Sequence, residues 1–316
     1  MKKQTIKTLF QEIYKKMESG ILLNNDTPFS EETLRTYRAT SNVLKNFKKE
    51  LNINSIDEGL YKDRRDRVSC RRRLKNFVNS YIDYLISLGY HPNTRKNHIK
   101  HIKSVLNKAS DEYGYSIYKL KNTQALETEV TAMTPKEVEY LHQNKPPKKF
   151  LRTWYYARLM LYSCMRIGDM NKFSISANQD YVNIITSKGK GSLSRVFLPD
   201  DVKNFLLNDN EKYNSTIFTR DLKELLKTYD IFNKTKTRYK FDKNGKSYSE
   251  KDYLWKIYTP HKLRSSGISW YLSKGLPEYQ VKKISGHSAN SKAFYRYVAH
   301  ADTEGLENQK NIINGC

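Results

Sequence analysis

The stretch from Thr259 to Tyr297 most constrains what this chain can form, because it joins helix signals to side chains that bind anions. Thr259 suits an N-cap and Pro260 fits the first helical position, where no intrahelical donor is lost. Apolar residues at helical spacing then predict a buried face that includes Leu263 and Gly267. The sequence therefore predicts a helix that begins at residue 260 and packs against a core.

Three chemically useful groups lie on and after this helix. His261 and Arg264 are three residues apart in its first turns, where free backbone N–H groups and the helix dipole favour an anion. A glycine-proline turn starts a second predicted helix, which ends at Gly286 with His287 beside it. A third short helical stretch carries Tyr295 and Tyr297. Together these groups suit attack on a phosphodiester.

These residues resemble the second signature box of the tyrosine recombinases, the phage-integrase family. The likeness consists of His261 to Arg264, then Gly286-His287, then a tyrosine about ten residues on. The family's first box, an arginine after a long apolar helix, matches Arg166 to Met170. The ending from Lys292 to Val298 is similar to that of Bacteroidetes-type integrases. Departures from the family pattern are Ser265, Ser285 and the segment Ser163-Cys164-Met165.

The resemblance implies a site-specific recombinase that cleaves and rejoins duplex DNA through a 3′-phosphotyrosine. It makes Tyr297 the nucleophile. The Y-x-x-V spacing of other members of the same family would select Tyr295 instead. It also makes Arg166 and Arg264 the ligands of the phosphate, assisted by His261 and His287. The ordinary alternatives are that Arg166 pairs with Asp169 and that each histidine is a cap or core residue. The joint spacing of these two arginines, two histidines and one tyrosine favours the catalytic interpretation.

A β-hairpin is predicted between the two signature boxes. Residues 181–186 and 195–198 are β-branched and apolar, and a glycine-rich turn with lysines separates them. By resemblance, a lysine of this hairpin is the general acid for the departing 5′ oxygen. Counting from the first strand selects Lys188, which we favour, while counting back from the second strand selects Lys190. Exposed lysines without a catalytic role are the alternative.

The predicted fold class is α+β and mostly helical, in two domains. Periodic apolar residues predict a helical core DNA-binding domain at 25–122, similar to the family's SAM-like bundle. An additional N-terminal helix is expected within residues 1–24, and residues 1–20 are a candidate binder of separate arm sites. A polar linker is placed at 123–131 and a mixed α/β catalytic domain at 132–316. Residues 233–256 predict an extra hairpin, which contacts DNA or a neighbouring subunit or is simply solvated.

A net charge of +24, from 57 Lys and Arg against 33 Asp and Glu, calls for a polyanionic partner. Nucleic acid is the leading candidate, because no apolar run reaches the length of a membrane span. The polar face of the fourth predicted helix also holds His98 and His101. Predicted DNA contacts come from two basic groups on the bundle, which are Arg71, Arg72, Arg73, Arg95, Lys96, Lys100 and Lys103.

Other partners follow from the same interpretation. No Walker loop, acidic triad or metal-ligand spacing stands out, so neither a metal nor another cofactor is expected. Three cysteines without CxxC spacing favour a reducing, cytoplasmic location. The family resemblance implies a homotetramer on two DNA sites, an accessory directionality factor, and a tail at 303–313 that docks on a neighbour. The rival functions are a helix-turn-helix regulator, read from residues 270–284, and a type IB topoisomerase.

Overall fold

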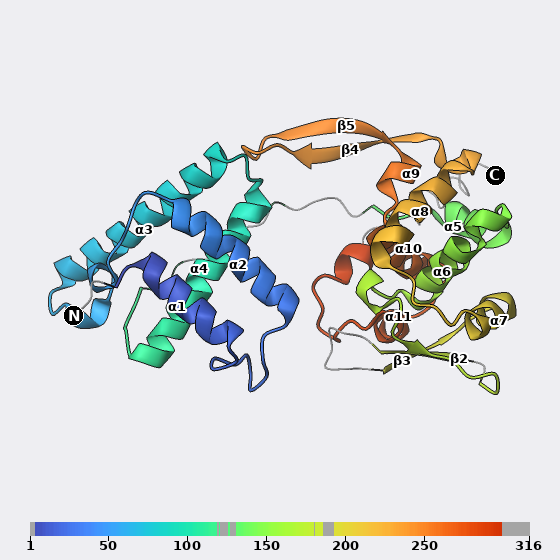
Figure 1. Cartoon of the computed structure of the whole chain (residues 1–316). Coiled ribbons are helices and arrows are strands. Elements are labelled where there is room, and N and C mark those ends of the chain that lie inside the picture. Colours follow the sequence, from blue (N-terminus) through green and yellow to red (C-terminus); the bar gives the residue numbers. More distant parts are fainter. Residues whose placement is uncertain are drawn as a thin grey trace. The chain divides into compact units, whose positions relative to one another are not determined.

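The computed structural model describes residues 4–118, 120, 126, 131–179, 181–185 and 193–298. The chain divides into two compact units (Figure 1). The first comprises Met1–Glu127 together with Lys240–Tyr248, and the second comprises Thr128–Tyr239 and Ser249–Cys316. Of the predicted linker at 123–131, only residues 126 and 131 are among those described. In the described part of the chain, no helix has the length and apolar character needed to span a membrane.

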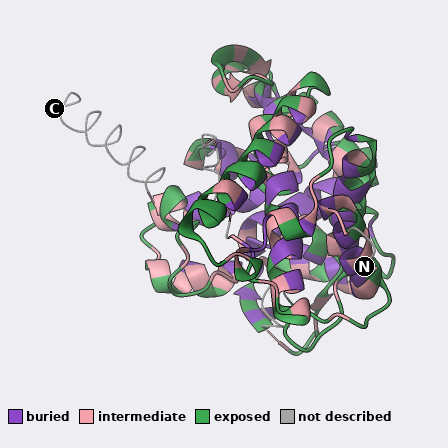
Figure 2. Ribbon diagram, turned by 90° about the vertical axis from the view of Figure 1, so that its left-hand side faces the viewer, coloured by how far each residue is buried: buried purple, intermediate pink, exposed green. Residues whose placement is uncertain are grey.

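The first unit is helical, as the apolar periodicity predicts. Its inner faces hold one core that includes Phe10, Leu44, Tyr81 and Ile102. Purple ribbon in Figure 2 marks the buried residues of the chain. The first helix contributes Leu9 and Phe10 to this core and packs on the second and fourth helices. The helices are α1 (Ile6–Glu18), α2 (Glu31–Asn46), α3 (Arg64–Ser87) and α4 (Pro92–Tyr113), with short 3-10 turns at Ile53–Ser55 and Glu58–Leu60.

The arginine-rich segment at 64–73 forms the first turns of α3, because Asp63 caps the helix and arginine is a good helix former. One detail of this unit differs from the prediction. His98 and His101 were expected on a polar face, but His98 is buried against Tyr81 and His101 stacks on Tyr37. Burial lowers the pKa of both rings, and that of His101 to about 4. Both histidines are therefore neutral packing residues at pH 7.

The second unit combines helices with a small antiparallel sheet, which confirms the mostly helical α+β class. The predicted hairpin pairs Val182 with Val196 and Ile184 with Ser194, and a two-residue strand extends the sheet in the order β1-β2-β3. The extra hairpin predicted at 233–256 is present as β4 and β5. The elements are α5 (Pro135–Gln143), η3 (Lys148–Phe150), α6 (Leu151–Ser163), η4 (Ile167–Asp169), β1 (Phe173–Ser174), β2 (Tyr181–Ile185), β3 (Leu193–Phe197), α7 (Asp200–Asn208), α8 (Ser215–Lys227), η5 (Asp230–Phe232), β4 (Thr235–Phe241), β5 (Ser247–Tyr253), α9 (Leu254–Ile257), α10 (Pro260–Ser273) and α11 (Glu278–Ser285).

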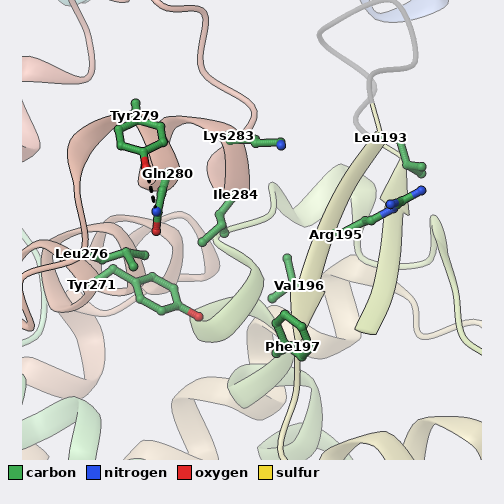
Figure 3. Close-up of a pocket in the computed structure, with 10 residues that line it drawn as sticks. All are labelled: Leu193, Arg195, Val196, Phe197, Tyr271, Leu276, Tyr279, Gln280, Lys283 and Ile284. Carbon is green, nitrogen blue, oxygen red and sulfur yellow. Dashed lines mark hydrogen bonds between the residues drawn. The ribbon is translucent and has the colours of Figure 1, made fainter. Parts of the chain in front are cut away.

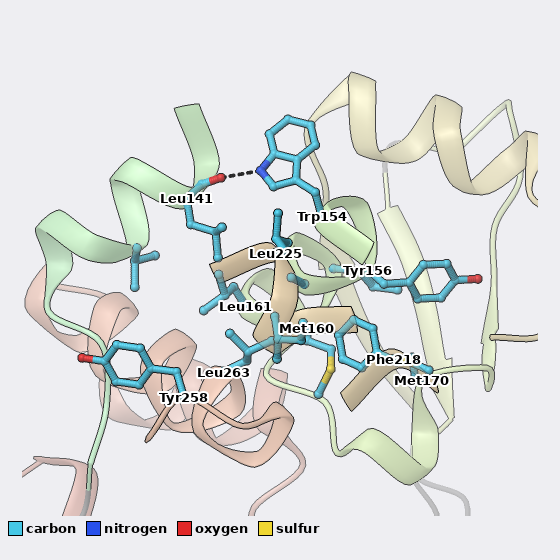
Figure 4. Packing of buried hydrophobic residues seen from close by; sticks show 14 of the residues in the cluster. Leu141, Trp154, Tyr156, Met160, Leu161, Met170, Phe218, Leu225, Tyr258 and Leu263 are labelled. Carbon is cyan, nitrogen blue, oxygen red and sulfur yellow. Dashed lines mark hydrogen bonds between the residues drawn. The ribbon is translucent and has the colours of Figure 1, made fainter. Parts of the chain in front are cut away.

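Helix α6 lies in the core of this unit. Its residues Met160 and Leu161 pack with Phe218 of α8 and Leu263 of α10 (Figure 4). The indole N–H of Trp154 donates a hydrogen bond of 2.6 Å to the carbonyl of Leu141, which joins α6 to α5. A smaller cluster at the C-terminal end of α6 contains Cys164, Ile268, Val281 and Phe294. The chain segments that carry both signature boxes thus share a packed interior.

Gly267 allows α10 to lie directly against α6. A Cβ atom built on this glycine would come within 2.1 Å of the carbonyl oxygen of Leu161 and 3.0 Å of Cys164 Sγ. We expect Gly267→Ala to destabilise the second unit by about 3 kcal/mol or more, because backbone atoms must move. Thermal unfolding of the full chain should show a midpoint lowered by roughly 6–12 °C. Gly168→Ala is the matched control, since nothing lies within 4 Å of its added carbon; equal midpoints for the two variants would contradict this close packing.

Candidate active site

Arg264 is held at the meeting point of three segments. Helix α10 begins with Thr259 as N-cap and Pro260 at its first position, as predicted. Arg264 is only 3% exposed, and its Nη1 donates to the carbonyl of Cys164 at the end of α6. Its Nη2 lies 3.3 Å from Nε2 and 3.4 Å from Nδ1 of His287, which follows α11. Packing therefore fixes the guanidinium before any ligand arrives.

Arg166 enters the same region from α6. Cys164 ends this helix in the left-handed conformation, with φ of 50°, and Arg166 follows in extended conformation as N-cap of η4. Nη1 of Arg166 is buried, and within the described residues it has no hydrogen-bond partner. A buried donor without a partner costs free energy, so such a group in a native protein calls for an explanation. An anionic ligand would provide one.

The two guanidinium groups lie close enough to affect each other. Burial lowers the pKa of Arg264, and the charge of Arg166 is the next largest cause. Tyr297 and Asp169 are close enough for their negative charge to raise the pKa of Arg264. Bringing two cations together in a poorly solvated place is unfavourable unless a negative charge joins them. The pair therefore favours binding of a phosphate-like group.

His287 completes one side of this region. Gly286 adopts φ of 63°, and the N–H of His287 donates to the carbonyl of Lys282 at 2.9 Å, so the end of α11 places the imidazole. Its ring contacts those of Phe294 and Tyr297, with centroid separations of 5.4 and 5.9 Å. Burial, followed by the charges of Arg264, Arg166 and Lys282, lowers the pKa of His287 to about 4. The ring is therefore neutral at pH 7 in the ligand-free protein.

The two candidate tyrosines have different surroundings. Tyr297 is half-buried and contacts both His287 and Phe294. Tyr295 is 54% exposed, and its ring lies 4.8 Å from the ammonium group of Lys282. Residues 295–298 are helical, so side chains two positions apart point in different directions. The structure thus brings Tyr297 together with Arg166, Arg264 and His287.

His261 and the hairpin lysines complete the predicted set. His261 is exposed in the first turn of α10, whereas Arg264, three residues later, is buried. Lys188 and Lys190 lie outside the described residues, as does the predicted tail at 303–313. Strand β3, which leads away from these lysines, is joined to the end of α11: the Ser194 hydroxyl lies 2.9 Å from the carbonyl of Ile284. The described strand after the lysine turn is therefore anchored beside His287.

Sequence reasoning missed two groups that hold the site. One is the carbonyl of Cys164, which no side-chain pattern can indicate. The other is Ser285, whose buried Oγ lies 2.7 Å from Nδ1 of His287. Its signal was available, because a serine stands two positions before the predicted catalytic histidine.

The predicted DNA contacts lie on α3 and α4 of the first unit. Arg71, Arg72 and Arg73 are exposed, but Arg71 pairs with Glu58 at 2.9 Å and lies over the ring of Tyr118. Arg95 donates to the carbonyls of Tyr90 and Lys243, the latter within the hairpin segment grouped with this unit. On α4, Lys100 is exposed, while Lys96 and Lys103 are partly buried. The basic residues are thus not equivalent, and some already have protein partners.

The second unit contains a cavity of about 750 Å³ between β3 and the segment from Tyr271 to Ile284. Figure 3 shows Val196 and Phe197 of β3 on one side and Leu276, Tyr279 and Ile284 on the other. None of the predicted catalytic residues that the structure describes lines it. Phe197 and Tyr279 are 72% and 69% exposed, so this part of the second unit presents aromatic surface to solvent. This cavity therefore does not coincide with the described residues of the candidate active site.

Comparisons with known proteins agree with this geometry. Residues 131–304 match the model of the phage integrase family. A lambda integrase dimer bound to a core site has a TM-score of 0.58 at 14% identity, covering 93% of this chain and 95% of that chain. The Tn1549 transposon integrase in complex with circular intermediate DNA has a TM-score of 0.60 at 12% identity, covering 93% and 95%.

A third similar structure is a lambda integrase tetramer bound to a Holliday junction, with a TM-score of 0.58 at 14% identity over 92% of this chain and 79% of that chain. The search of curated proteins gave no match. At these identities the structural likeness shows the fold, whereas the family model spans more than half of the chain. The chain therefore belongs to the phage integrase family, and its enzyme class is the tyrosine-type site-specific recombinase.

Proposed function

We propose that Tyr297 attacks the scissile phosphate of a duplex DNA core site. The phenolic oxygen forms a bond to phosphorus while the bond from phosphorus to the 5′ oxygen breaks, which leaves a 3′-phosphotyrosine and a 5′ hydroxyl. Arg166 and Arg264 bind the non-bridging oxygens, and His261 and His287 assist them. The observation that carries this proposal is the buried, unpartnered Nη1 of Arg166 beside the buried Arg264. Fixed cations of this kind stabilise charge that develops in the transition state.

The phosphotyrosine retains the energy of the broken bond, so rejoining requires only attack by a 5′ hydroxyl from a partner strand. We therefore propose that the reaction uses neither ATP nor a metal, since arginines supply the positive charge. A suicide duplex with a nick just beyond the scissile phosphate tests the assignment, because the short leaving strand diffuses away. Peptide mapping of the trapped adduct should find the nucleotide on Tyr297. A nucleotide on another tyrosine would refute that role.

Lys188 is proposed as the general acid that protonates the departing 5′ oxygen, with Lys190 as the alternative. Replacing this oxygen by sulfur gives a leaving group that departs without a proton. We expect Lys188→Ala to lower cleavage of the normal duplex by 10²–10⁴-fold, the usual contribution of general acid catalysis. The same variant should cleave the sulfur-containing duplex at the wild-type rate. Lys190→Ala is the matched control, and rescue of that variant instead would transfer the role.

The basic residues of α3 and α4 are proposed to bind phosphates around the core site. Each neutralised phosphate contributes about 0.9 to the slope of log K against log salt. We expect Arg72→Gln and Arg73→Gln each to reduce this slope by about 1. Arg71→Gln should have a smaller effect, because Glu58 already neutralises part of its charge. Fluorescence anisotropy over a salt series measures the slopes, and a larger loss in Arg71→Gln would contradict the ranking.

Assembly as a homotetramer on two DNA sites is part of the proposal. Exchange between two duplexes requires four strand cleavages, and one nucleophile per chain then requires four chains. The exposed aromatic surface around Phe197 and Tyr279 supports contact between subunits. Mass photometry should detect four chains of 37.3 kDa on two joined duplexes. Two plasmids that carry the site should yield recombinants; relaxed circles alone would favour a topoisomerase, and binding without any adduct would favour a regulator.

The biological setting is proposed from the C-terminal pattern. The segment from Lys292 to Val298 supports a place among Bacteroidetes-type integrases that move a mobile element. Integration, excision or inversion of such an element acts on DNA in the cytoplasm and commonly requires an accessory directionality factor. Selection of bound duplexes from a randomised pool would identify the core site. Recovery of a sequence at the ends of a mobile element would support this setting, while dispersed genomic matches would oppose it.

A further inference from the structure

Ser285 makes the shortest polar contact to His287. Its Oγ is 2.7 Å from Nδ1 of the ring, and the serine side chain is buried in the last turn of α11. The same Oγ lies 2.6 Å from the carbonyl of Val281 and 3.4 Å from that of Lys282. The hydroxyl therefore meets two carbonyl oxygens and one imidazole nitrogen.

Counting protons decides the direction of these hydrogen bonds. Carbonyl oxygens only accept, so the single hydroxyl proton of Ser285 goes to the carbonyl of Val281 at 2.6 Å. The remaining lone pairs of Oγ then face Nδ1, which must carry a proton to make a bond. If Ser285 instead donated to Nδ1, two oxygens would lie 2.6 Å apart with no proton between them.

Arg264 does not choose between the two ring nitrogens. Its Nη2 is nearly equidistant from them, at 3.3 and 3.4 Å. The two nitrogens flank one ring carbon, so an atom this close to both lies against the ring face and not along one lone pair. Among the described residues, the serine contact is thus the one that distinguishes the nitrogens. At neutral pH the ring carries one proton, since its pKa is lowered to about 4.

We infer that Ser285 is a positioning residue that holds His287 in the tautomer with the proton on Nδ1, leaving the lone pair on Nε2. Ser285 is one of the positions where this chain departs from the family pattern, and the contact depends on its hydroxyl, which an apolar side chain would lack. His287 then offers an acceptor at Nε2 and becomes a donor there only after it binds a second proton. The catalytic meaning rests on the proposed role of His287 at the phosphate, whereas the tautomer itself does not.

Nitrogen-15 NMR of the full chain, labelled on histidine, reads the tautomer without DNA. Loss of one signal in His287→Gln assigns the resonances. We expect Nδ1 of His287 to carry the proton in the wild-type protein, and Ser285→Ala to give a mixture of tautomers and a lower imidazolium pKa. A wild-type spectrum dominated by the Nε2–H form would overturn the inference even if Tyr297 forms the adduct.

Cleavage of the suicide duplex supplies the second readout. Ser285→Ala should cleave on the order of 10-fold more slowly, the lower end of the range for removing a partner that orients a metal-bound histidine. DNA affinity should not change, and Ser285→Thr, which keeps the hydroxyl, should restore both the spectrum and the rate. Ser269→Ala is the matched control, because Ser269 is a buried serine of α10 with no hydrogen-bond partner for its Oγ in the described residues. Equal spectra and rates in Ser285→Ala and Ser269→Ala would refute the role.

Discussion

Tyr297→Phe is expected to abolish formation of the covalent adduct while DNA binding stays at the wild-type level. The substitution removes only the phenolic oxygen, so the ring can keep its contacts with His287 and Phe294. Tyr295→Phe is the matched control, because it removes the phenolic oxygen of a tyrosine two residues away. The Tyr295 ring is exposed and lies over Lys282. Denaturing electrophoresis of the suicide reaction measures the adduct.

The comparison between these two variants decides the nucleophile. We expect the Tyr295→Phe protein to form the adduct at the wild-type rate. An adduct that persists in Tyr297→Phe and disappears in Tyr295→Phe would reverse the assignment, and loss in both variants would show that the local helix is sensitive to either change. Thermal unfolding of both proteins separates that last outcome from chemistry.

Arg264→Lys is expected to lower the rate of cleavage by 10²–10³-fold, the range for removal of one fixed transition-state donor. A lysine keeps the charge but cannot reproduce a planar guanidinium that spans the Cys164 carbonyl and the His287 ring. Single-turnover cleavage at saturating protein measures the chemical step separately from DNA affinity. Cleavage by this variant at the wild-type rate would remove Arg264 from the site.

Arg158→Lys is the matched control for this second prediction. Arg158 is also buried, at 5% exposure, but it pairs with Asp201 of α7, a helix that carries no predicted site residue. Both variants place an ammonium group in a buried position, so both should lower the unfolding midpoint. Only Arg264→Lys should lose cleavage per folded molecule, and a similar loss in Arg158→Lys would attribute the effect to general destabilisation.

The sequence predicted those features that local chemistry determines. Thr259 and Pro260 define the start of α10, and the β-branched residues of 181–186 and 195–198 define a hairpin, because capping and strand preferences act over a few residues. Arg264 was identified by its spacing, but its burial was not, since this depends on the carbonyl of Cys164 one hundred residues away. Tertiary contacts of that kind leave no local signal.

The errors have the same cause. His98 and His101 were placed among exposed lysines because polarity alone cannot show that Tyr81 and Thr40 offer them buried partners. Ser285 was treated as a departure from a family pattern, although its distance to His287 makes it part of the site. A polar residue within two positions of a predicted catalytic histidine is thus worth weighing as its partner. Helical periodicity reports where apolar faces lie, but it does not report which polar groups meet.

The structure of the covalent complex on a suicide duplex would test the central claim most directly. It should show a bond between the phenolic oxygen of Tyr297 and phosphorus, with nitrogens of Arg166 and Arg264 at about 2.8 Å from the non-bridging oxygens. A phosphate bonded to a different side chain, with Arg166 and Arg264 turned toward other partners, would contradict it.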